Sequence, residues 1–397
     1  MHPNVPHLRF PKFYGEWCVS TIGEQFDLYS GNTPSRLNKE HFDGNVNWIT
    51  SGELKEHYIS DTKEKISEDA ATANNLKLLH PGTFVIAIYG LEADGVRGTG
   101  SITCKESTIS QACMAFTQKG DVKNEFLYSW YKKHGNIIGI KYAQGTKQQN
   151  LSYDILEKFH IAYPSQDEQD KLIQFISLLD ERIATQSKLI EDLKKLKSAI
   201  IDYAINSHDT DFAKFGSLYE TAGEGGTPTT SNASFYDNGK IPFIKIDDLK
   251  KKYLTKNKDF ITELGLQKSS AWLVPTRSIL FSNGATIGEI TITTYPVCTK
   301  QGILGIVPKP NIDVEFLYYF MSSSYFKKAV SRIVTEGTMK TVYLKDINNI
   351  RCPIPTKEKQ LDIAKMPSAL NSKIDFEQSI LKLFGSQKQY LLRQMFM

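Results

Sequence analysis

Several hallmarks of metalloproteins and membrane proteins are missing from this 397-residue sequence. The five cysteines are scattered and odd in number, with no Cys-x-x-Cys or His-x-x-x-His spacing, so they predict reduced thiols rather than disulfides or metal ligands. No apolar run approaches the length of a membrane span, and the first residues lack the hydrophobic core of a signal peptide. We therefore expect a cytoplasmic protein without a metal site.

Motifs that carry out chemistry are also missing. The sequence has no Gly-x-x-x-x-Gly-Lys-Ser/Thr loop, no Gly-x-Ser-x-Gly elbow and no Asn/Asp-Pro-Pro-Tyr/Phe motif of an amino-methyltransferase. The nearest candidate is Asp43 followed by Glu53 and Lys55, a spacing with which some nucleases hold a divalent metal, and it recurs loosely around Asp248. So short a pattern arises readily by chance. We expect no catalytic residues, and a Mg²⁺-dependent nuclease is the less favoured alternative.

The sequence also has no strong excess of one charge, because its 48 Lys and Arg are nearly balanced by 44 Asp and Glu, which gives a net charge of +4. The charge is uneven along the chain: residues 211–355 carry 18 basic and 13 acidic side chains, 165–210 carry 6 and 9, and 11–164 carry 16 and 18. Bulk charge thus indicates nucleic acid weakly, and only for the second half of the chain. Any DNA-binding role depends on where individual residues lie.

What the sequence does have is an internal repeat, in which a series of turns, apolar runs and helical segments recurs after about 190 positions. The same order is kept along the whole chain, which isolated coincidences do not explain. Gly/Pro turns of this kind mark the loops between the repeated elements. The matched positions are Gly31, Thr33 and Pro34 with Gly226, Thr227 and Pro228; Trp48 with Phe243; Gly90 with Gly284; Gln111 with Gln301; Phe126 with Phe316; Gly145 and Thr146 with Gly337 and Thr338; and Pro164 and Gln169 with Pro355 and Gln360.

Each copy closes with a heptad pattern of apolar residues, typical of a coiled-coil seam. Gln186 and Lys197 interrupt the first seam where Glu377 and Lys388 interrupt the second, and buried polar residues of this kind fix register. Pro367 falls on the second seam, so we expect that helix to start there rather than to be kinked. We expect the helices to pack on each other, antiparallel; two helices packed on separate domains is the alternative. The seams are Leu172, Ile176, Leu179, Ile183, Ile190, Leu193 and Ile200, and Ile363, Pro367, Leu370, Ile374, Leu381, Phe384 and Leu391.

The segments most alike between the copies are polar loops rather than apolar strands. Gly allows backbone N–H groups to approach a phosphate, Thr and Lys bind its oxygens, and Gln, Asn, Arg or Lys can bind base edges in the major groove. Taken singly, each loop is more simply explained as an ordinary Gly turn capped by hydroxyls. We pair the loop at 97–99 with that at 284–286. The predicted DNA-binding residues are Arg97, Thr99, Gln111, Thr146, Lys147, Gln148, Gln149 and Asn150 in the first copy and Thr286, Lys300, Gln301, Thr338, Lys340 and Thr341 in the second.

These residues and their order give the chain a resemblance, over essentially its whole length, to the specificity subunits of type I restriction-modification systems. The resemblance lies in the opening Leu8 to Pro11 with Trp17, in the duplicated turns, in the heptad helices, and in the short motifs Tyr89 to Glu92 and Asn283 to Gly288. No single motif is specific. The repeated order, with the helices between, is.

The resemblance implies an α+β fold with two tandem α/β target-recognition domains, each with a small curved sheet, held apart by two long antiparallel coiled-coil helices in a pseudo-twofold repeat. We expect the domains to span 1–164 and 208–356 and the helical spacers 165–207 and 357–397. About 36 helical residues extend about 54 Å, so the helices would act as a ruler between two DNA-reading domains.

The resemblance also implies partners. Each domain would read one half of a two-part, asymmetric site in double-stranded DNA. Two methyltransferase subunits would dock against the recognition domains and the helices, including their seam residues, and an ATP-dependent restriction subunit would complete the nuclease. S-adenosylmethionine, ATP and Mg²⁺ would belong to those partners, with no cofactor in this chain. A protein-only scaffold that sequesters modification subunits is the main alternative.

Overall fold

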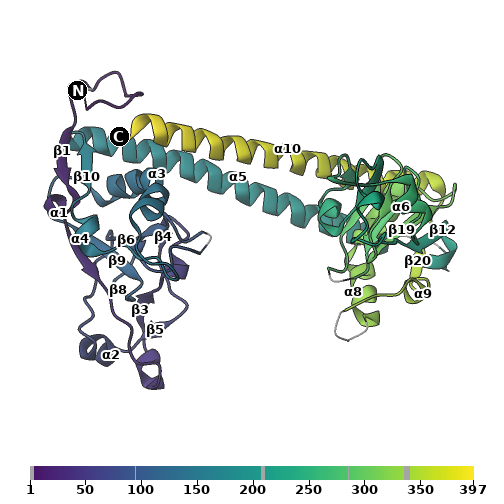
Figure 1. Ribbon diagram of the computed structural model, residues 1–397, viewed down its shortest axis with the longest axis horizontal. Coiled ribbons are helices and arrows are strands. Elements are labelled where there is room, and N and C mark those ends of the chain that lie inside the picture. Colours follow the sequence, from purple (N-terminus) through teal and green to yellow (C-terminus); the bar gives the residue numbers. More distant parts are fainter. Residues whose placement is uncertain (1–3, 94, 207–210, 285, 335–339) are drawn as a thin grey trace. The chain divides into compact units, whose positions relative to one another are not determined.

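The computed structural model describes residues 4–93, 95–206, 211–284, 286–334 and 340–397, and its chain separates into two compact units. Unit 1 comprises Met1–Gln186 and Ile380–Met397, and unit 2 comprises Ser187–Ser379; both can be followed by chain colour in Figure 1. The division passes through both long helices, so each unit contains part of each. The expected domain borders remain a prediction.

Unit 1 is built on a five-stranded sheet of order β2-β9-β6-β7-β4 beside a three-stranded sheet of order β5-β3-β8, and the strands β1 and β10 form a separate pair. Neighbours in the larger sheet are antiparallel except β4 and β7. The strands are β1 (Cys18–Thr21), β2 (Phe26–Ser30), β3 (Val46–Ile49), β4 (Tyr58–Ile59), β5 (Lys65–Ile66), β6 (Phe84–Ala87), β7 (Gly100–Thr103), β8 (Ser107–Ile109), β9 (Cys113–Gln118) and β10 (His160–Tyr163), and the shorter helices are α1 (Ile22–Gln25), α2 (Glu68–Ala73), α3 (Asn124–Tyr142) and α4 (Tyr153–Leu156).

Unit 2 repeats this topology strand for strand, with sheets β12-β19-β16-β17-β14 and β15-β13-β18 and the pair β11-β20. The sequence repeat is therefore a repeat of whole domains. The strands are β11 (Phe212–Lys214), β12 (Tyr219–Glu224), β13 (Ile241–Ile244), β14 (Tyr253–Leu254), β15 (Asp259–Ile261), β16 (Ile279–Ser282), β17 (Ile290–Thr293), β18 (Cys298–Thr299), β19 (Ile303–Pro308) and β20 (Arg351–Pro353), and the shorter helices are α6 (Glu263–Gln267), α7 (Val314–Ser322), α8 (Ser324–Ile333) and α9 (Leu344–Ile347).

The central strand of each larger sheet is buried on both faces, so β6 is apolar throughout and β16 is apolar except for its last residue, Ser282. In β6, Phe84 and Ile86 belong to the core that includes α3, while Val85 and Ala87 face the smaller sheet. Successive side chains of a strand point to opposite faces, so one short apolar run supplies both cores. Unit 2 divides β16 in the same way, with Phe281 in the core beside α7 and Leu280 on the opposite face.

Two long helices, α5 (Gln166–Asn206) and α10 (Lys357–Met395), contribute to both units. In unit 1 the first part of α5 packs against the last part of α10, where Leu172 and Ile176 share a core with Leu392 (Figure 1). In unit 2 the last part of α5 packs against the first part of α10, where Ile201 shares a core with Ile363. Within each unit the two helices thus run antiparallel, as expected. Among the described residues, no helix is both long enough and apolar enough to cross a bilayer.

The expected late start of the second helix at Pro367 is wrong, because α10 begins at Lys357 and continues through the proline. Proline removes one helical N–H and crowds the preceding turn, which costs about 3 kcal/mol in a helix interior. Tertiary contacts offset this cost here. Pro367 is buried, and the next residue, Ser368, is hydrogen-bonded to Lys252 and Tyr319 of unit 2.

The repeated glutamines explain how each long helix is attached to its domain. Gln169 donates to the carbonyls of Pro164 and Asp121, and its Oε1 accepts from the N–H of Lys123 at 2.9 Å, directly before α3. Gln360 makes the same three bonds at the start of α10, to the carbonyls of Pro355 and Asn311 and from the N–H of Asp313. Both side chains are fully buried, so a three-bond staple joins helix and domain in each copy.

Candidate nucleic-acid interface

The polar loops predicted to bind DNA in unit 1 meet at one edge of the five-stranded sheet. The loop that leaves β6 donates from Ile88 N–H to the carbonyl of Ala112, at 2.9 Å, in the turn before β9. Its own Ile88 carbonyl accepts from Leu151 N–H at 2.9 Å, and Leu91 N–H donates to the Gln149 carbonyl at 3.0 Å. Three segments far apart in the sequence are therefore fastened together through backbone hydrogen bonds.

Unit 2 has the same fastening. Asn283 N–H, directly after β16, donates to the Gly302 carbonyl at 3.0 Å, and the Asn283 carbonyl accepts from Val342 N–H at 2.9 Å. The Asn283 side chain adds a bond to the Val342 carbonyl at 3.2 Å. Backbone bonds are indifferent to side-chain identity, so this frame can be kept while the exposed side chains differ between copies.

The predicted residues of unit 1 fall into two groups. Gln111, Thr146, Lys147 and Gln148 are exposed and available to a ligand. The others already have partners inside the domain: Arg97 donates to the Gln149 Oε1 at 2.9 Å, Thr99 donates to the Val96 carbonyl at 2.7 Å, and the backbone of Asn150 pairs with Gln144. This second group shapes the edge, and a DNA contact by Arg97 would require it to exchange a partner.

In unit 2 the predicted residues Thr286, Lys300, Gln301 and Lys340 are exposed, and Thr341 is partly buried. Thr338 lies outside the described residues. The N–H of Gln301 donates to the Thr227 hydroxyl at 3.2 Å, and that of Lys300 donates to the Ile244 carbonyl at 2.9 Å. Both backbones are fixed while both side chains face solvent, which suits side chains that read a ligand.

The strand register changes two of the pairings drawn from sequence. Gly98 and Gly288 each lie two residues before the second strand of their hairpins, and both have positive φ, at 71° and 104°. The counterpart of Arg97 is therefore Ile287, not a residue of 284–286. Arg97 packs against Gly139 of α3, whereas Ile287 packs on the apolar core of unit 2. An arginine at this place, predicted from the sequence to read guanine, therefore occurs in one copy only.

In the Gly/Thr/Pro turns only the glycine pairing changes, while Thr33 with Thr227 and Pro34 with Pro228 stay as paired from the sequence. A Cβ on Gly31 would collide with the carbonyl of Ile109, and a Cβ on Gly225 would collide with the carbonyl of Thr299. These carbonyls belong to the equivalent strands β8 and β18, so Gly31 matches Gly225 rather than Gly226. Residues 225 and 226 are both glycine, so the sequence alone does not show which of them matches Gly31.

Carboxylates at these edges serve as caps. Glu92 accepts from the N–H of Gln149 at 2.7 Å, and this hydrogen bond lowers the pKa of Glu92 below its ordinary value. Glu224 accepts from the N–H of Gly302 at 2.9 Å. Each edge therefore carries one carboxylate that closes its loop by accepting a hydrogen bond from a backbone N–H.

The residues of the nuclease alternative are structural. Glu53 accepts from the N–H groups of Thr50 and Lys63, at 2.8 and 2.7 Å, and the equivalent Asp248 accepts from the N–H of Lys245 at 3.0 Å. Both close the turn that precedes β4 or β14. Within the described ranges, no group of three or more His, Cys, Asp or Glu side chains could hold a metal ion. These carboxylates therefore give the nuclease alternative no support.

The heptad seam is the least exposed stripe of each long helix. Every apolar seam position named from the sequence is buried or partly buried, and none is exposed. The polar interruptions have partners across the seam: Lys388 binds Asp180 in unit 1, and Lys197 donates to Asn371 at 3.0 Å in unit 2. Arg182 stacks on Phe384, with 4.4 Å between guanidinium carbon and ring centre. Within each unit the seam thus faces the other long helix.

Known proteins share this architecture. The type I restriction modification DNA specificity domain matches twice, over residues 14–195 and 209–383. The MjaIX type I specificity subunit of Methanocaldococcus jannaschii is 24% identical over 86% of this chain and 83% of its own length, and the MjaVIII specificity subunit of the same organism is 22% identical over 93% and 89%.

Solved structures agree on the fold. The type I S subunit from M. genitalium superposes with a TM-score of 0.57 at 18% identity, covering 99% of both chains. A chain from a study of complex assembly and conformational transition of the type I R-M system gives 0.62 at 14%, covering 95% of this chain and 96% of that one. The resemblance drawn from the sequence is confirmed: this chain belongs to the family of type I restriction-modification DNA specificity subunits and carries that family's domain twice.

Proposed function

We propose that this chain reads a two-part DNA site, with the loop edge of unit 1 on one half and the loop edge of unit 2 on the other. The observation that carries the proposal is the repeated backbone frame, Ile88 to Ala112 and Leu151 in one copy and Asn283 to Gly302 and Val342 in the other. An unchanged frame with different exposed side chains is what two readers of different sequences need.

The exposed residues divide by chemistry. Lys147, Lys300 and Lys340 suit phosphate oxygens, where they position the protein without reading sequence. Gln111 and Gln301 occupy equivalent turns, and a glutamine amide can make paired hydrogen bonds to the edge of adenine. We therefore assign these two glutamines to base reading, one in each half-site.

The chain itself performs no chemistry in this proposal. Methyltransferase subunits, which supply S-adenosylmethionine, would dock against the outer faces of α5 and α10 in the cytoplasm, and an ATP-dependent restriction subunit that uses Mg²⁺ would join them. Since the seam residues are turned toward the partner helix, docking must use other positions of these helices. The exposed apolar residues Leu189, Tyr203 and Leu361 are candidates.

The test is to co-express the chain with a modification subunit, purify the complex and map methylated adenines across a genome by single-molecule sequencing. One interrupted two-part motif is expected. Gln111→Ala and Gln301→Ala form a matched pair, each expected to relax a different half. A stable complex that methylates no motif would overturn DNA reading in favour of a protein scaffold, and cleavage of DNA by the lone chain with Mg²⁺ would favour the nuclease.

A further inference from the structure

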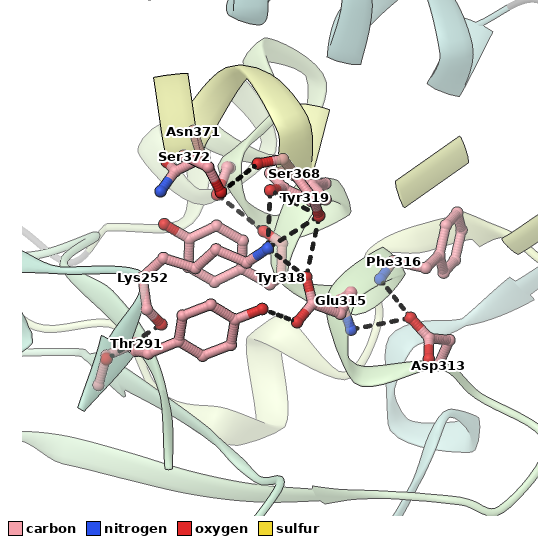
Figure 2. Close-up of polar contacts among 12 residues, drawn as sticks. Lys252, Thr291, Asp313, Glu315, Phe316, Tyr318, Tyr319, Ser368, Asn371 and Ser372 are labelled. Carbon is pink, nitrogen blue, oxygen red and sulfur yellow. Dashed lines mark hydrogen bonds and ion pairs between the residues drawn. The ribbon is translucent and has the colours of Figure 1, made fainter. Parts of the chain in front are cut away.

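A buried lysine joins three elements of unit 2. Lys252, directly before β14, has only 5% of its surface exposed, and its Nζ binds the carboxylate of Glu315 on α7 (Figure 2). The same Nζ donates to the hydroxyl of Tyr319 at 2.8 Å and to the hydroxyl of Ser368 on α10 at 2.9 Å. The ammonium also lies 4.6 Å from the centre of the Tyr319 ring and 4.9 Å from that of Tyr253. One cation thus fastens the sheet to α7 and α10.

A histidine holds the equivalent place in unit 1. His57 directly precedes β4, and its carbonyl accepts from Ile102 N–H at 2.7 Å, just as the Lys252 carbonyl accepts from Ile292 N–H at 2.7 Å. The imidazole Nε2 lies 2.8 Å from Glu125 on α3, and Glu125 and Glu315 are each the second residue of their helix.

The aromatic setting of His57 also matches. Its ring stacks between Tyr58 and Tyr128, with ring centres 4.1 and 3.9 Å away. Its Nδ1 lies 3.7 Å from Asp180 on α5. Asp180 in turn binds Lys388, as Asn371 binds Lys197 in unit 2. The frame is repeated with an imidazole in place of an ammonium at its centre and with Asp180 in place of Asn371 beside it.

The charges around His57 decide its titration. Burial opposes a positive charge on the ring, but the carboxylates of Asp180 and Glu125 favour it more strongly, so the pKa of His57 is raised above its ordinary value. Lys388 binds Asp180 and not His57 itself. The Nζ of Lys132 on α3 lies 5.0 Å from the centre of the Tyr128 ring. Tyr58 and Tyr128 do not compete, because burial raises the pKa of Tyr58 to about 12 and that of Tyr128 further.

We propose that His57 is a proton-dependent latch between the sheet, α3 and α5 in unit 1, and that Lys252 holds the equivalent place in unit 2. When protonated, the imidazole can satisfy Glu125 and Asp180 together. When neutral, it leaves the partly exposed carboxylate of Glu125 without a cation, while Asp180 keeps Lys388. Removing one partner of an ion pair that is partly withdrawn from water destabilises the joint. In unit 1, therefore, the contacts between the sheet, α3 and α5 weaken as pH rises and His57 loses its proton.

The direction follows from linkage. A histidine with a raised folded pKa contributes stability that is complete below its ordinary pKa of 6.5 and is lost as pH rises through the folded value. Lys132 has the opposite sign: burial lowers its pKa to about 8, so it opposes folding while charged and stops doing so as pH rises. A loosening of unit 1 with rising pH therefore cannot come from Lys132.

The test uses the full chain and the reciprocal exchange His57→Lys and Lys252→His. Amide hydrogen exchange is compared between wild type and variant at the same pH, 6.0 and then 8.5, which cancels the intrinsic pH effect on exchange. At 8.5 the β4 and early α3 amides of wild type should exchange about fivefold faster than those of His57→Lys, with no difference at 6.0. Lys252→His should transfer the same behaviour to β14 and α7.

A second measurement is made on the wild-type protein, and a variant is needed only to assign the signal. The Hε1 resonance of His57, assigned by its loss in His57→Gln, should titrate with a pKa above 6.5 in the full-length protein. Equal exchange of wild type and His57→Lys at both pH values would overturn the latch, as would a His57 pKa at or below 6.5. Neither readout involves DNA, so the latch and the DNA-reading proposal can fail separately.

Discussion

The substitution Lys252→Met removes the buried cation of unit 2 but keeps most of its aliphatic length between the tyrosine rings. Glu315, whose side chain is 20% exposed, is left without its counter-ion. Removing one partner of a buried pair costs about 3–5 kcal/mol. Glu315 keeps hydrogen bonds from the hydroxyls of Tyr253 and Ser368, and each charge-assisted bond is worth about 1.5–3 kcal/mol. We therefore expect a loss near the lower limit, about 3 kcal/mol.

The assay is urea denaturation of the full chain labelled with 5-fluorotryptophan. Trp272 reports on unit 2, and Trp17, Trp48 and Trp130 report on unit 1, so the fluorine signals separate the two transitions. Lys252→Met should lower the free energy of unfolding at Trp272. The matched control is Lys245→Met, which removes a surface pair with Asp259 whose side chains are 47% and 40% exposed, and should cost less than about 1 kcal/mol.

A double-mutant cycle completes the argument. Glu315→Gln alone leaves the buried Lys252 without its carboxylate partner, whereas Lys252→Met with Glu315→Gln removes both members of the pair. We expect the double variant to be more stable than the sum of the single losses by about 1–3 kcal/mol. A Lys252→Met loss no greater than that of Lys245→Met, or strictly additive losses in the cycle, would refute the reasoning.

Three further predictions concern reading, acid stability and spacing. Gln301→Ala should weaken discrimination at one half-site by about 1–3 kcal/mol and leave the other unchanged, as measured by methylated-motif sequencing; equal loss at both halves would indicate general unfolding. Burial lowers the pKa of His134 to about 4, so the stability that this neutral histidine contributes above pH 6.5 is lost as pH falls toward 4. In urea titrations at a series of pH values, His134→Phe should reduce by about 2 kcal/mol the free energy of unfolding that is lost on acidification. An unchanged dependence of stability on pH would contradict this prediction. If helix length sets the half-site spacing, deleting one heptad from both α5 and α10, about 10 Å, should shorten the methylated motif's spacer by about 3 base pairs, and an unchanged spacer would reject the ruler.

The sequence by itself determined the repeat, the heptad seams and the family. Periodicities of this kind are local: a helix seam returns every three or four residues and a buried strand is a short apolar run, so both can be read without knowing the fold. The paired glutamines Gln169 and Gln360 were visible as repeated letters. Their role in joining helix to domain by three hydrogen bonds was not, since it depends on carbonyls 48 and 49 positions away.

Only the tertiary structure decided which residues are equivalent and which are partners. It showed that α10 continues through Pro367, because contacts such as that of Lys252 with Ser368 offset the cost of a proline inside a helix. Local sequence rules treat that cost as decisive. It matched Arg97 with Ile287, because strand register rather than letter identity sets equivalence. It also brought His57 to Glu125 and Asp180, 68 and 123 positions away in the chain. A titratable cation is recognisable only when the charges around it are known, and those charges come from distant segments that folding brings together.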